Sequence, residues 1–86
     1  MDQKMVVKLY ALSTCVHCRA VRSFLESNKI AFSSVNVDEL EKWQRKEMIR
    51  EVKKYNGKGS FPTLVVGEKV IVGFKEDELK IAFELV

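Results

Sequence analysis

The stretch MVVKLYALSTCVHC, residues 5–18, decides the fold of this chain. Its first part, residues 5–11, is apolar at nearly every position and rich in β-branched and large side chains, which predicts a strand that is covered on both faces. Cys15 and Cys18 follow directly after this strand, where the pattern changes to helical spacing. The stretch therefore predicts a central strand that leads into a helix through a pair of cysteines.

The positions after the first cysteine predict a helix over residues 15–28. Four apolar residues recur there at helical spacing and define one buried side: Ala20, Val21, Phe24 and Leu25. Ser13 and Thr14 precede the helix, and either hydroxyl could cap its first turn. The first helix is thus expected to begin at the cysteines and to pack one side against the strand.

Further elements are predicted along the rest of the chain. They are a strand over residues 31–38, a helix over 39–55, a hairpin of strands 63–66 and 69–72, and a last helix over 75–85. Asp38 stands where a cap for the second helix belongs, and Gly67 with Glu68 forms the hairpin turn. A strand, a helix and a strand in succession imply a parallel pair with a right-handed crossover. The chain is therefore predicted to be an α/β protein in the order β-α-β-α-β-β-α.

Length and composition narrow the class of protein. The chain has 86 residues, a formal charge of +3, 47% hydrophobic residues and 31% charged residues, which is ordinary for one small globular domain spanning residues 1–86. No apolar run approaches the roughly 20 residues of a membrane-spanning helix, and the first residues lack the hydrophobic region of a signal peptide. A cytoplasmic protein without membrane contact is the expectation.

The two cysteines are better placed for chemistry than for stability. Cys15 and Cys18 are so close in sequence that a disulfide between them closes too small a loop to stabilise the fold much. At a helix start, unpaired backbone N–H groups stabilise a thiolate, and helical spacing brings the second sulfur beside the first. One cysteine can then attack a disulfide and the other can release the product. The pair predicts thiol–disulfide exchange.

Helical periodicity assigns different roles to the two thiols. Cys18 falls beside the apolar side of the helix, whereas Cys15 falls on the side of Arg19 and Arg22. Cys15 is therefore predicted to be the exposed attacking residue, and the two arginines are predicted to favour its thiolate or to guide an anionic substrate. His17 either donates a hydrogen bond to a sulfur or is an exposed residue without a role.

Metal binding is the alternative interpretation of the cysteine pair. A structural zinc site needs four ligands, and one chain supplies one cysteine pair and one histidine. Two chains that share their pairs could still hold zinc or an iron–sulfur cluster. A non-catalytic dimer built around such a centre therefore stays open beside the enzyme. No metal site and no tightly bound cofactor are expected within one chain.

Three motifs in this order resemble the glutaredoxins and their small relatives in the thioredoxin superfamily. They are Cys15-Val16-His17-Cys18 after the first strand, Phe61-Pro62-Thr63 at the start of the third strand, and Gly73-Phe74-Lys75-Glu76-Asp77 at the last helix. The resemblance covers nearly the whole chain. It implies a thioredoxin-like fold, a four-stranded mixed sheet with helices on both faces, and a thiol–disulfide oxidoreductase that reduces protein or glutathione mixed disulfides.

The resemblance also implies which residues carry the activity. Cys15 is the nucleophile and Pro62 is cis beside it, with the Phe61 backbone pairing to a substrate peptide or to glutathione. The residues expected to form the substrate site are His17, Lys58, Phe61, Pro62, Thr63, Gly73, Phe74, Glu76 and Asp77. Glu76 and Asp77 are also explained as acids that stabilise the start of a helix.

Departures from the usual glutaredoxin pattern bear on the reductant. Many glutaredoxins have Pro-Tyr between the cysteines and a lysine three residues before the first, where this chain has Val16-His17 and Leu12. In place of a double glycine before the last helix it has Gly73-Phe74, which is closer to the glutaredoxin-like hydrogen donors of ribonucleotide reductase that thioredoxin reductase serves. Glutathione and thioredoxin reductase are both candidate reductants of a monomer that acts on disulfide-containing proteins.

A basic stretch covers the second predicted helix. Residues 42–58 carry seven basic side chains against Glu47 and Glu51, a local charge of +5. The basic residues are Lys42, Arg45, Lys46, Arg50, Lys53, Lys54 and Lys58. Such a face could steer an acidic protein partner or be simply solvated. Nucleic-acid binding is not expected, because the aromatics of the stretch, Trp43 and Tyr55, have core roles available.

Overall fold

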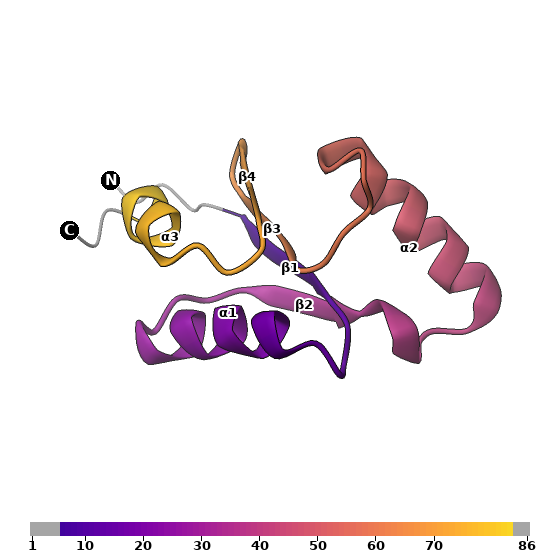
Figure 1. The fold of residues 1–86 in the computed structure, drawn as a ribbon, viewed down its shortest axis with the longest axis horizontal. Coiled ribbons are helices and arrows are strands. Elements are labelled where there is room, and N and C mark those ends of the chain that lie inside the picture. The colour runs from indigo at the N-terminus through magenta and orange to yellow at the C-terminus, as the bar shows by residue number, and fades with distance from the viewer. Residues whose placement is uncertain (1–5, 84–86) are drawn as a thin grey trace.

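The computed structural model describes residues 6–83 of the chain. Along them lie β1 (Val7–Ala11), α1 (Val16–Ser27), β2 (Ser33–Asn36), the 3₁₀ helix η1 (Val37–Glu39), α2 (Lys42–Tyr55), β3 (Thr63–Val66), β4 (Lys69–Val72) and α3 (Glu76–Ala82) (Figure 1). The predicted order of strands and helices is confirmed, with a 3₁₀ turn added between β2 and α2. Met5 and Leu85, the predicted outer bounds of the first strand and the last helix, lie outside the described residues.

The strands form one mixed sheet in the order β2-β1-β3-β4. β1 pairs parallel to β2 and antiparallel to β3, and β3 pairs antiparallel to β4. The turn of this hairpin holds Gly67 at a φ of 60°, which a residue without Cβ adopts without strain. The parallel register sets Ala11 opposite Asn36, so the carboxyl ends of β1 and β2 meet at one end of the sheet. The predicted four-stranded mixed sheet is confirmed.

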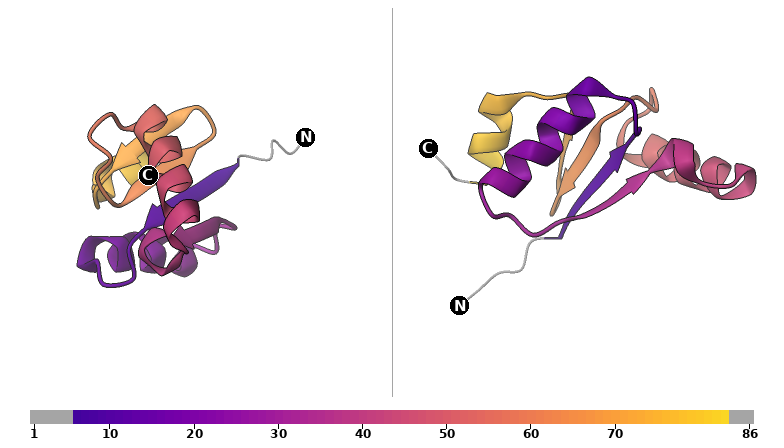
Figure 2. Two further views of the ribbon diagram at one scale, coloured as in Figure 1. Left: turned by 90° about the vertical axis from the view of Figure 1, so that its right-hand side faces the viewer. Right: turned by 90° about the horizontal axis from the view of Figure 1, so that it is seen from below.

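The helices lie on both faces of the sheet, as predicted. Figure 2 shows α1 and α3 on one face and α2 on the other. The side chains of β1 explain this division, because successive residues of a strand point to opposite faces. Leu9 and Ala11 belong to the core under α1 and α3, whereas Tyr10 belongs to the core under α2. Both faces of β1 are therefore covered.

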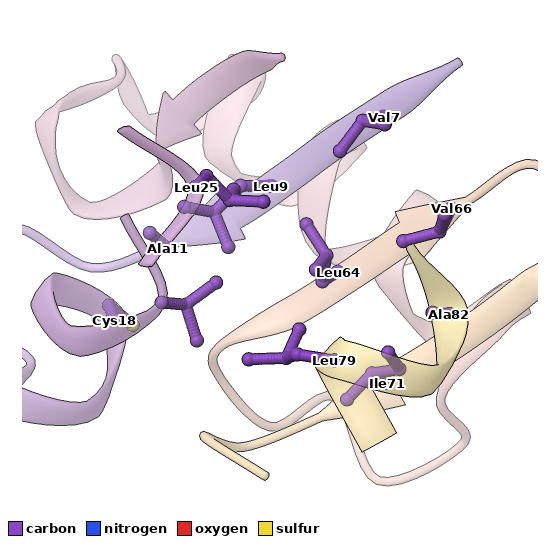
Figure 3. Packing of buried hydrophobic residues seen from close by; sticks show 11 residues of the cluster. Val7, Leu9, Ala11, Cys18, Leu25, Leu64, Val66, Ile71, Leu79 and Ala82 are labelled. Carbon is purple, nitrogen blue, oxygen red and sulfur yellow. The ribbon is translucent and has the colours of Figure 1, made fainter. Parts of the chain in front are cut away.

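The larger core, which we call the α1/α3 core, fills the space between the sheet and these two helices (Figure 3). Besides the thiol of Cys18, its buried members are aliphatic: Val7, Leu9, Ala11, Val21, Leu25, Leu64, Val66, Ile71, Leu79 and Ala82. A fully buried leucine contributes about 1.5–3 kcal/mol relative to an exposed one, so the leucines dominate the stability of this face. Through Cys18, one member of the cysteine pair is part of this core.

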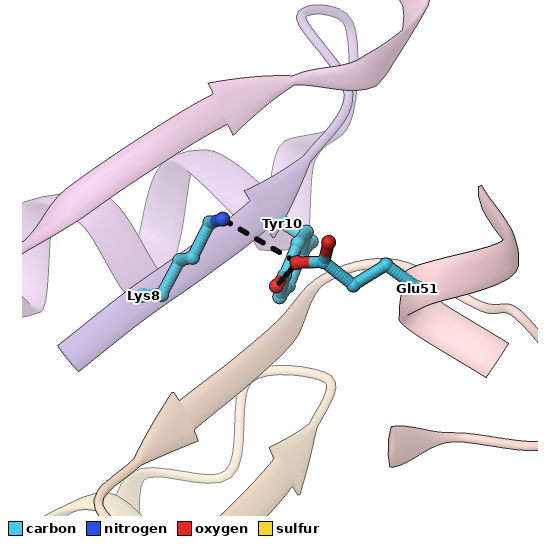
Figure 4. A network of polar contacts seen from close by, with 3 residues as sticks. All are labelled: Lys8, Tyr10 and Glu51. Carbon is cyan, nitrogen blue, oxygen red and sulfur yellow. Dashed lines mark hydrogen bonds and ion pairs between the residues drawn. The ribbon is translucent and has the colours of Figure 1, made fainter. Parts of the chain in front are cut away.

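The smaller core, which we call the α2 core, lies on the opposite face. Its buried members are Tyr10, Val52 and Val65. The Tyr10 hydroxyl donates a hydrogen bond to Glu51 of α2, and Lys8 forms an ion pair with the same carboxylate at 3.4 Å (Figure 4). Burial, together with this carboxylate, holds the pKa of Tyr10 well above its usual range. α2 is therefore attached to the sheet by a short apolar stripe and one polar network.

Two predicted helix caps are wrong. Cys15 itself, not Ser13 or Thr14, is the N-cap of α1. Asp38 lies within η1 rather than at the start of α2, and its carboxylate accepts hydrogen bonds from Ser13 instead. α2 begins only at Lys42, because η1 takes up the positions at which the sequence pattern starts the helix. Asp38 therefore binds Ser13, which is distant in the sequence, instead of the backbone of the helix that follows it.

The expected core role of Trp43 is wrong. Trp43 is 64% exposed and Tyr55 is 45% exposed, whereas Val52 is the buried residue of α2. At about 100° per residue, Trp43 lies on the side of the helix opposite Val52. Tyr55 keeps a partial packing role, since its ring centroid lies 6.1 Å from that of Tyr10. The outer side of α2 is left to the basic residues and Trp43.

The second half of the chain follows the prediction more closely. β3 and β4 have the predicted bounds, and α3 begins one residue later than predicted, with Lys75 as its N-cap. Leu79 and Ala82 are buried, while the acids Glu76 and Asp77 occupy the first turn of α3. Within residues 6–83, no helix combines the length and the hydropathy that crossing a membrane requires.

Candidate active site

The loop between β1 and α1 places the cysteine pair at the carboxyl end of the central strand. The N–H of Cys15 donates to the carbonyl of Leu12 at 3.2 Å, which closes the turn. The Asp38 carboxylate accepts from the Ser13 hydroxyl at 2.5 Å and from the Ser13 N–H at 2.9 Å. These hydrogen bonds lower the pKa of Asp38, the hydroxyl having the larger effect. The loop is therefore bound to η1 beyond the end of β2.

Cys15 caps α1 with its own sulfur. The N–H of Cys18 donates to Cys15 Sγ at 3.2 Å. The first N–H groups of a helix lack carbonyl partners, so a sulfur at this position satisfies one of them. Both cysteines are free thiols, and that of Cys15 is half-buried.

Cys18 has a different environment. It is 1% exposed and belongs to the α1/α3 core. Burial, followed by its hydrogen bond with Cys15, raises the pKa of the Cys18 thiol to about 12, against smaller lowering effects of the Leu12 backbone and Arg22. The predicted difference in exposure between the two cysteines is therefore observed. Cys15 is thus partly open to solvent, whereas Cys18 is closed off from it.

The segment before β3 approaches the same region. The Phe61–Pro62 peptide bond is cis, in agreement with the resemblance. The carbonyl of Pro62 accepts a hydrogen bond from the N–H of Gly73 at 2.9 Å, which joins the start of β3 to the segment before α3. Cys15, Phe61 and Phe74 are half-buried and pack against the α1/α3 core. The fold thus places the three sequence motifs around one core.

Thr63 is buried rather than open to a substrate through its side chain. It is 0% exposed, and its hydroxyl donates to the carbonyl of Ser60 at 2.7 Å. Asn56 organises the loop before it, because its amide nitrogen donates to the same carbonyl at 3.3 Å and its oxygen accepts from the Lys58 N–H at 3.2 Å. Sequence reasoning missed this role. The pattern that could have indicated it is an Asn between a helix and a turn, where its side chain bonds to nearby backbone.

The ionisable side chains expected at the substrate site are all exposed: His17, Lys58, Glu76 and Asp77. Glu76 forms an ion pair with Lys80 at 3.6 Å, one turn along α3. Both residues line a shallow groove between α1 and α3, together with Phe74. Lys58 lies on the turn after α2, before the proline segment in the chain. The expected set therefore divides into a basic contribution from this turn and an acidic one from the start of α3.

The two arginines predicted beside Cys15 have different surroundings. Arg19 is exposed, whereas Arg22 is half-buried. The guanidinium of Arg22 donates to Ser34 Oγ at 3.0 Å and to Asn36 Oδ1 at 3.1 Å. Both acceptors belong to β2, so Arg22 joins α1 to the edge strand of the sheet. Sequence alone places the two arginines on one side of the helix and does not separate them.

Metal ligands do not gather in the part of the chain that the structure describes. No three His, Cys, Asp or Glu side chains lie close enough there to hold a metal ion. What the site does offer is one half-open thiol, capped by an N–H, and a second thiol within the same helical turn. Two neighbouring thiols of unequal access are equipped for disulfide exchange through a mixed disulfide.

Fold and site together define a protein of the thioredoxin-like fold with a close cysteine pair at the start of α1. The match to a family model gives a narrower class than the fold alone. The family model for glutaredoxin matches residues 7–71, and the chain belongs to the glutaredoxin family. A curated relative, the uncharacterized glutaredoxin-like 8.6 kDa protein in the rubredoxin operon of Clostridium pasteurianum, is 34% identical over 74 residues, which cover 86% of this chain and 92% of the relative.

Two solved archaeal structures are similar to this chain in both sequence and fold. The methanoredoxin of Methanosarcina acetivorans is 39% identical with a TM-score of 0.84, and the match covers 88% of this chain and 81% of that one. The glutaredoxin of Archaeoglobus fulgidus is 36% identical with a TM-score of 0.86, and the match covers 90% of this chain and 84% of that one. The similarity extends over most of each chain.

Proposed function

We propose that this protein is a thiol–disulfide oxidoreductase in which Cys15 is the nucleophile and Cys18 the resolving thiol. The observation that carries the proposal is the hydrogen bond of 3.2 Å from the Cys18 N–H to Cys15 Sγ. It sets both sulfurs within one helical turn while the first is half-open and the second is buried. An accessible sulfur with an N–H donor suits attack, and a protected neighbour suits release.

The exchange consists of two displacements. The Cys15 thiolate attacks one sulfur of a substrate disulfide, the substrate S–S bond breaks, and the leaving thiolate takes up a proton. Cys18 then loses its proton and attacks the Cys15 sulfur of the mixed disulfide. The bond between Cys15 and the substrate breaks, the Cys15–Cys18 disulfide forms, and the second product leaves as a thiol. Two electrons pass from the dithiol to the substrate.

The substrate is proposed to lie along the proline segment. The backbone of Phe61, next to the cis Pro62, pairs with an extended peptide or with glutathione, while Thr63 supports the segment from within. Phe74 borders the substrate on the side of α3, because the hydrogen bond from the Gly73 N–H to the Pro62 carbonyl holds this segment beside the proline. Exposed polar side chains provide contacts for a polar substrate: Lys58 suits acidic groups, Glu76 and Asp77 suit amines, and His17 suits a hydrogen-bonding group.

Two reductants are proposed for the return of the dithiol, glutathione and a flavoprotein thioredoxin reductase. The oxidised protein is offered glutathione with glutathione reductase and, separately, thioredoxin reductase, and NADPH consumption is followed in each case. Rapid turnover with one of the two systems assigns the reductant. It also shows whether the protein functions like the glutathione-dependent glutaredoxins or like the hydrogen donors that thioredoxin reductase serves. We place the activity in a cytoplasmic monomer of one domain, residues 1–86, because a reducing compartment keeps close cysteines as thiols.

Serine variants of the two cysteines test the role assignment. Cys15→Ser is expected to lose disulfide exchange, because no nucleophile remains at the open position. Cys18→Ser is expected to accumulate a mixed disulfide, which intact-protein mass spectrometry detects as the mass of the substrate half. An adduct on Cys15→Ser and none on Cys18→Ser would reverse the assignment. A brown or zinc-containing dimer on purification would support the metal-binding alternative instead.

A further inference from the structure

Arg22 reaches the end of the sheet from which the cysteine loop departs. It lies four residues after Cys18, and residues at this spacing share one side of a helix. Its guanidinium is bound to Ser34 and Asn36 of β2 at 3.0 and 3.1 Å. Asn36 is in register with Ala11, the last residue of β1. The two hydrogen bonds therefore hold a positive charge beside the strand end that leads to the cysteines.

The partners of Arg22 hold this charge without cancelling it. One acceptor is a hydroxyl oxygen and the other an amide oxygen, and both are neutral. Within residues 6–83, no carboxylate lies within ion-pair distance of the Arg22 guanidinium. Glu39 joins the network only through the amide nitrogen of Asn36, at 3.1 Å. The positive charge of the guanidinium is therefore not neutralised by an ion pair and can act on groups nearby on α1.

We propose that Arg22 acts on Cys18 in the second displacement: fixed by Ser34 and Asn36, its charge favours loss of the Cys18 proton as that thiol attacks the mixed disulfide. This inference rests on the function proposed above and deepens it. It assigns Arg22 to the resolving thiol rather than to the Cys15 thiolate. It also separates Arg22 from Arg19, which is exposed and makes no such bridge to β2.

Cys18 requires such a charge because its surroundings oppose ionisation. The strands β1, β3 and β4 and the helix α3 contribute only aliphatic residues to the core that holds it. Burial raises the pKa of Cys18, as does Cys15, whereas the Leu12 backbone and Arg22 lower it. In the mixed disulfide Cys15 is no longer a thiol, and Arg22, four residues after Cys18 on the same side of α1, is a cation that its bonds to β2 hold in place. The η1 acid Asp38 is bound to Ser13.

The step balances without a further reactant. The Cys18 proton passes to water, the new sulfur thiolate attacks Cys15 Sγ, and the electron pair of the bond to the substrate leaves with the substrate sulfur. Arg22 changes the ease of the proton loss and takes no part in the bonds. Its removal should therefore affect the second displacement and its pH dependence more than the first.

The test separates the two displacements with 4,4′-dithiodipyridine, a small disulfide that is uncharged near neutral pH. Reduced protein releases thiopyridone in two phases, and absorbance follows both. The first phase depends on probe concentration and reports attack by Cys15, whereas the second does not and reports attack by Cys18. Arg22→Met should raise the pH midpoint of the second phase by about 0.5–1 unit, which slows it roughly three- to tenfold below the midpoint. Arg22→Lys should restore at least half of the shift.

Arg19→Met is the matched comparison, because it removes the same charge from an exposed position of the same helix. Its second-phase midpoint should move by less than half as much. His17 is present in every variant. An unmoved midpoint in Arg22→Met overturns the proposal, even if thermal unfolding shows a loss of stability, and so does an equal shift in Arg19→Met. Failure of the proposed function has a different signature, because the wild-type protein would then show no second phase.

Discussion

The two faces of the sheet are held by different forces. Under α1 and α3, ten aliphatic residues and one thiol form a continuous apolar core, and no charged side chain enters it. Under α2, three buried residues are supplemented by the polar network of Lys8, Tyr10 and Glu51. The difference teaches that the face which holds the buried member of the cysteine pair is the apolar one. The helix on the other face depends on a carboxylate that is still partly open to solvent.

This division suits the proposed chemistry. A resolving thiol inside an apolar core stays protonated until the mixed disulfide brings a sulfur to it, which protects the reduced protein from side reactions. The cost is that ionisation of the thiol needs local help. The core itself offers none, so that help has to come from its margin, where Arg22 is bound to β2. The same comparison predicts how each face responds to substitution.

The largest effect is expected in the α1/α3 core. Leu25→Ala should destabilise the protein by about 2–5 kcal/mol, because Leu25 is completely buried and the core cannot collapse fully around the cavity. Urea unfolding followed by far-UV circular dichroism measures the change. Ile81→Ala is the matched control on the outer side of α3, where the side chain is 62% exposed, and it should change stability by less than about 0.5 kcal/mol. Equal effects of the two variants would contradict the assignment of the core.

A smaller, pH-dependent effect is expected on the α2 face. The Tyr10 hydrogen bond, and after it the Lys8 charge, lower the pKa of Glu51. A lowered folded pKa means that the unfolded chain binds more protons, so this stabilisation is complete above the unfolded pKa of about 4.3 and is lost as pH falls through the folded value. Glu51→Gln should cost roughly 1 kcal/mol near neutral pH, a figure discounted for the solvent exposure of the carboxylate, and less in acid.

Urea midpoints at neutral and acid pH measure this dependence, with Glu47→Gln as the matched control on the same helix. Among residues 6–83, Glu47 pairs with exposed Arg50 alone, at 3.8 Å, so its replacement should have little effect at either pH. A wild-type protein and a Glu51→Gln variant that differ equally at both pH values would show that the network stabilises through packing alone.

The smallest effect is expected on the outer side of α2. Trp43→Ala should change the free energy of unfolding by less than about 0.5 kcal/mol, because the indole is 64% exposed. Trp43 is the one tryptophan of the chain, so its fluorescence should already be that of a solvated indole in the native state and shift little on unfolding. A strongly blue-shifted native emission would show that the indole is packed against other atoms in solution. It would contradict the exposed position of Trp43 on α2.

Local patterns along the chain were sufficient for much of this architecture. The apolar run before the cysteines predicted a strand covered on both faces, and helical periodicity predicted that Cys18 turns inward while Cys15 does not. Gly67 and Glu68 predicted the hairpin with its observed bounds. These features depend on neighbours in the sequence, and hydrophobic periodicity reports such neighbours directly.

Capping and the fate of polar side chains could not be predicted in the same way. Asp38 is a residue type that often caps helices, yet it binds Ser13 in a loop that is distant in the sequence. Trp43 is a residue type common in cores, yet α2 contacts the sheet through a narrow stripe around Val52 and through Glu51, and Trp43 lies on the other side of the helix. In each case the residue type is compatible with two environments, and the choice between them follows from which element packs nearby.

The sequence by itself thus determined the order of elements, a parallel strand pair, a hairpin and the position of a cysteine pair at a helix start, because these follow from periodicity and spacing; the mixed sheet came from the resemblance to glutaredoxins. Only the tertiary structure decided three hydrogen bonds: from Arg22 to Asn36 of β2, from Tyr10 to Glu51, and from the Gly73 N–H to the Pro62 carbonyl. Such contacts join residues far apart in the chain. Their formation depends on how the sheet brings strand ends and helices together, which no local pattern encodes.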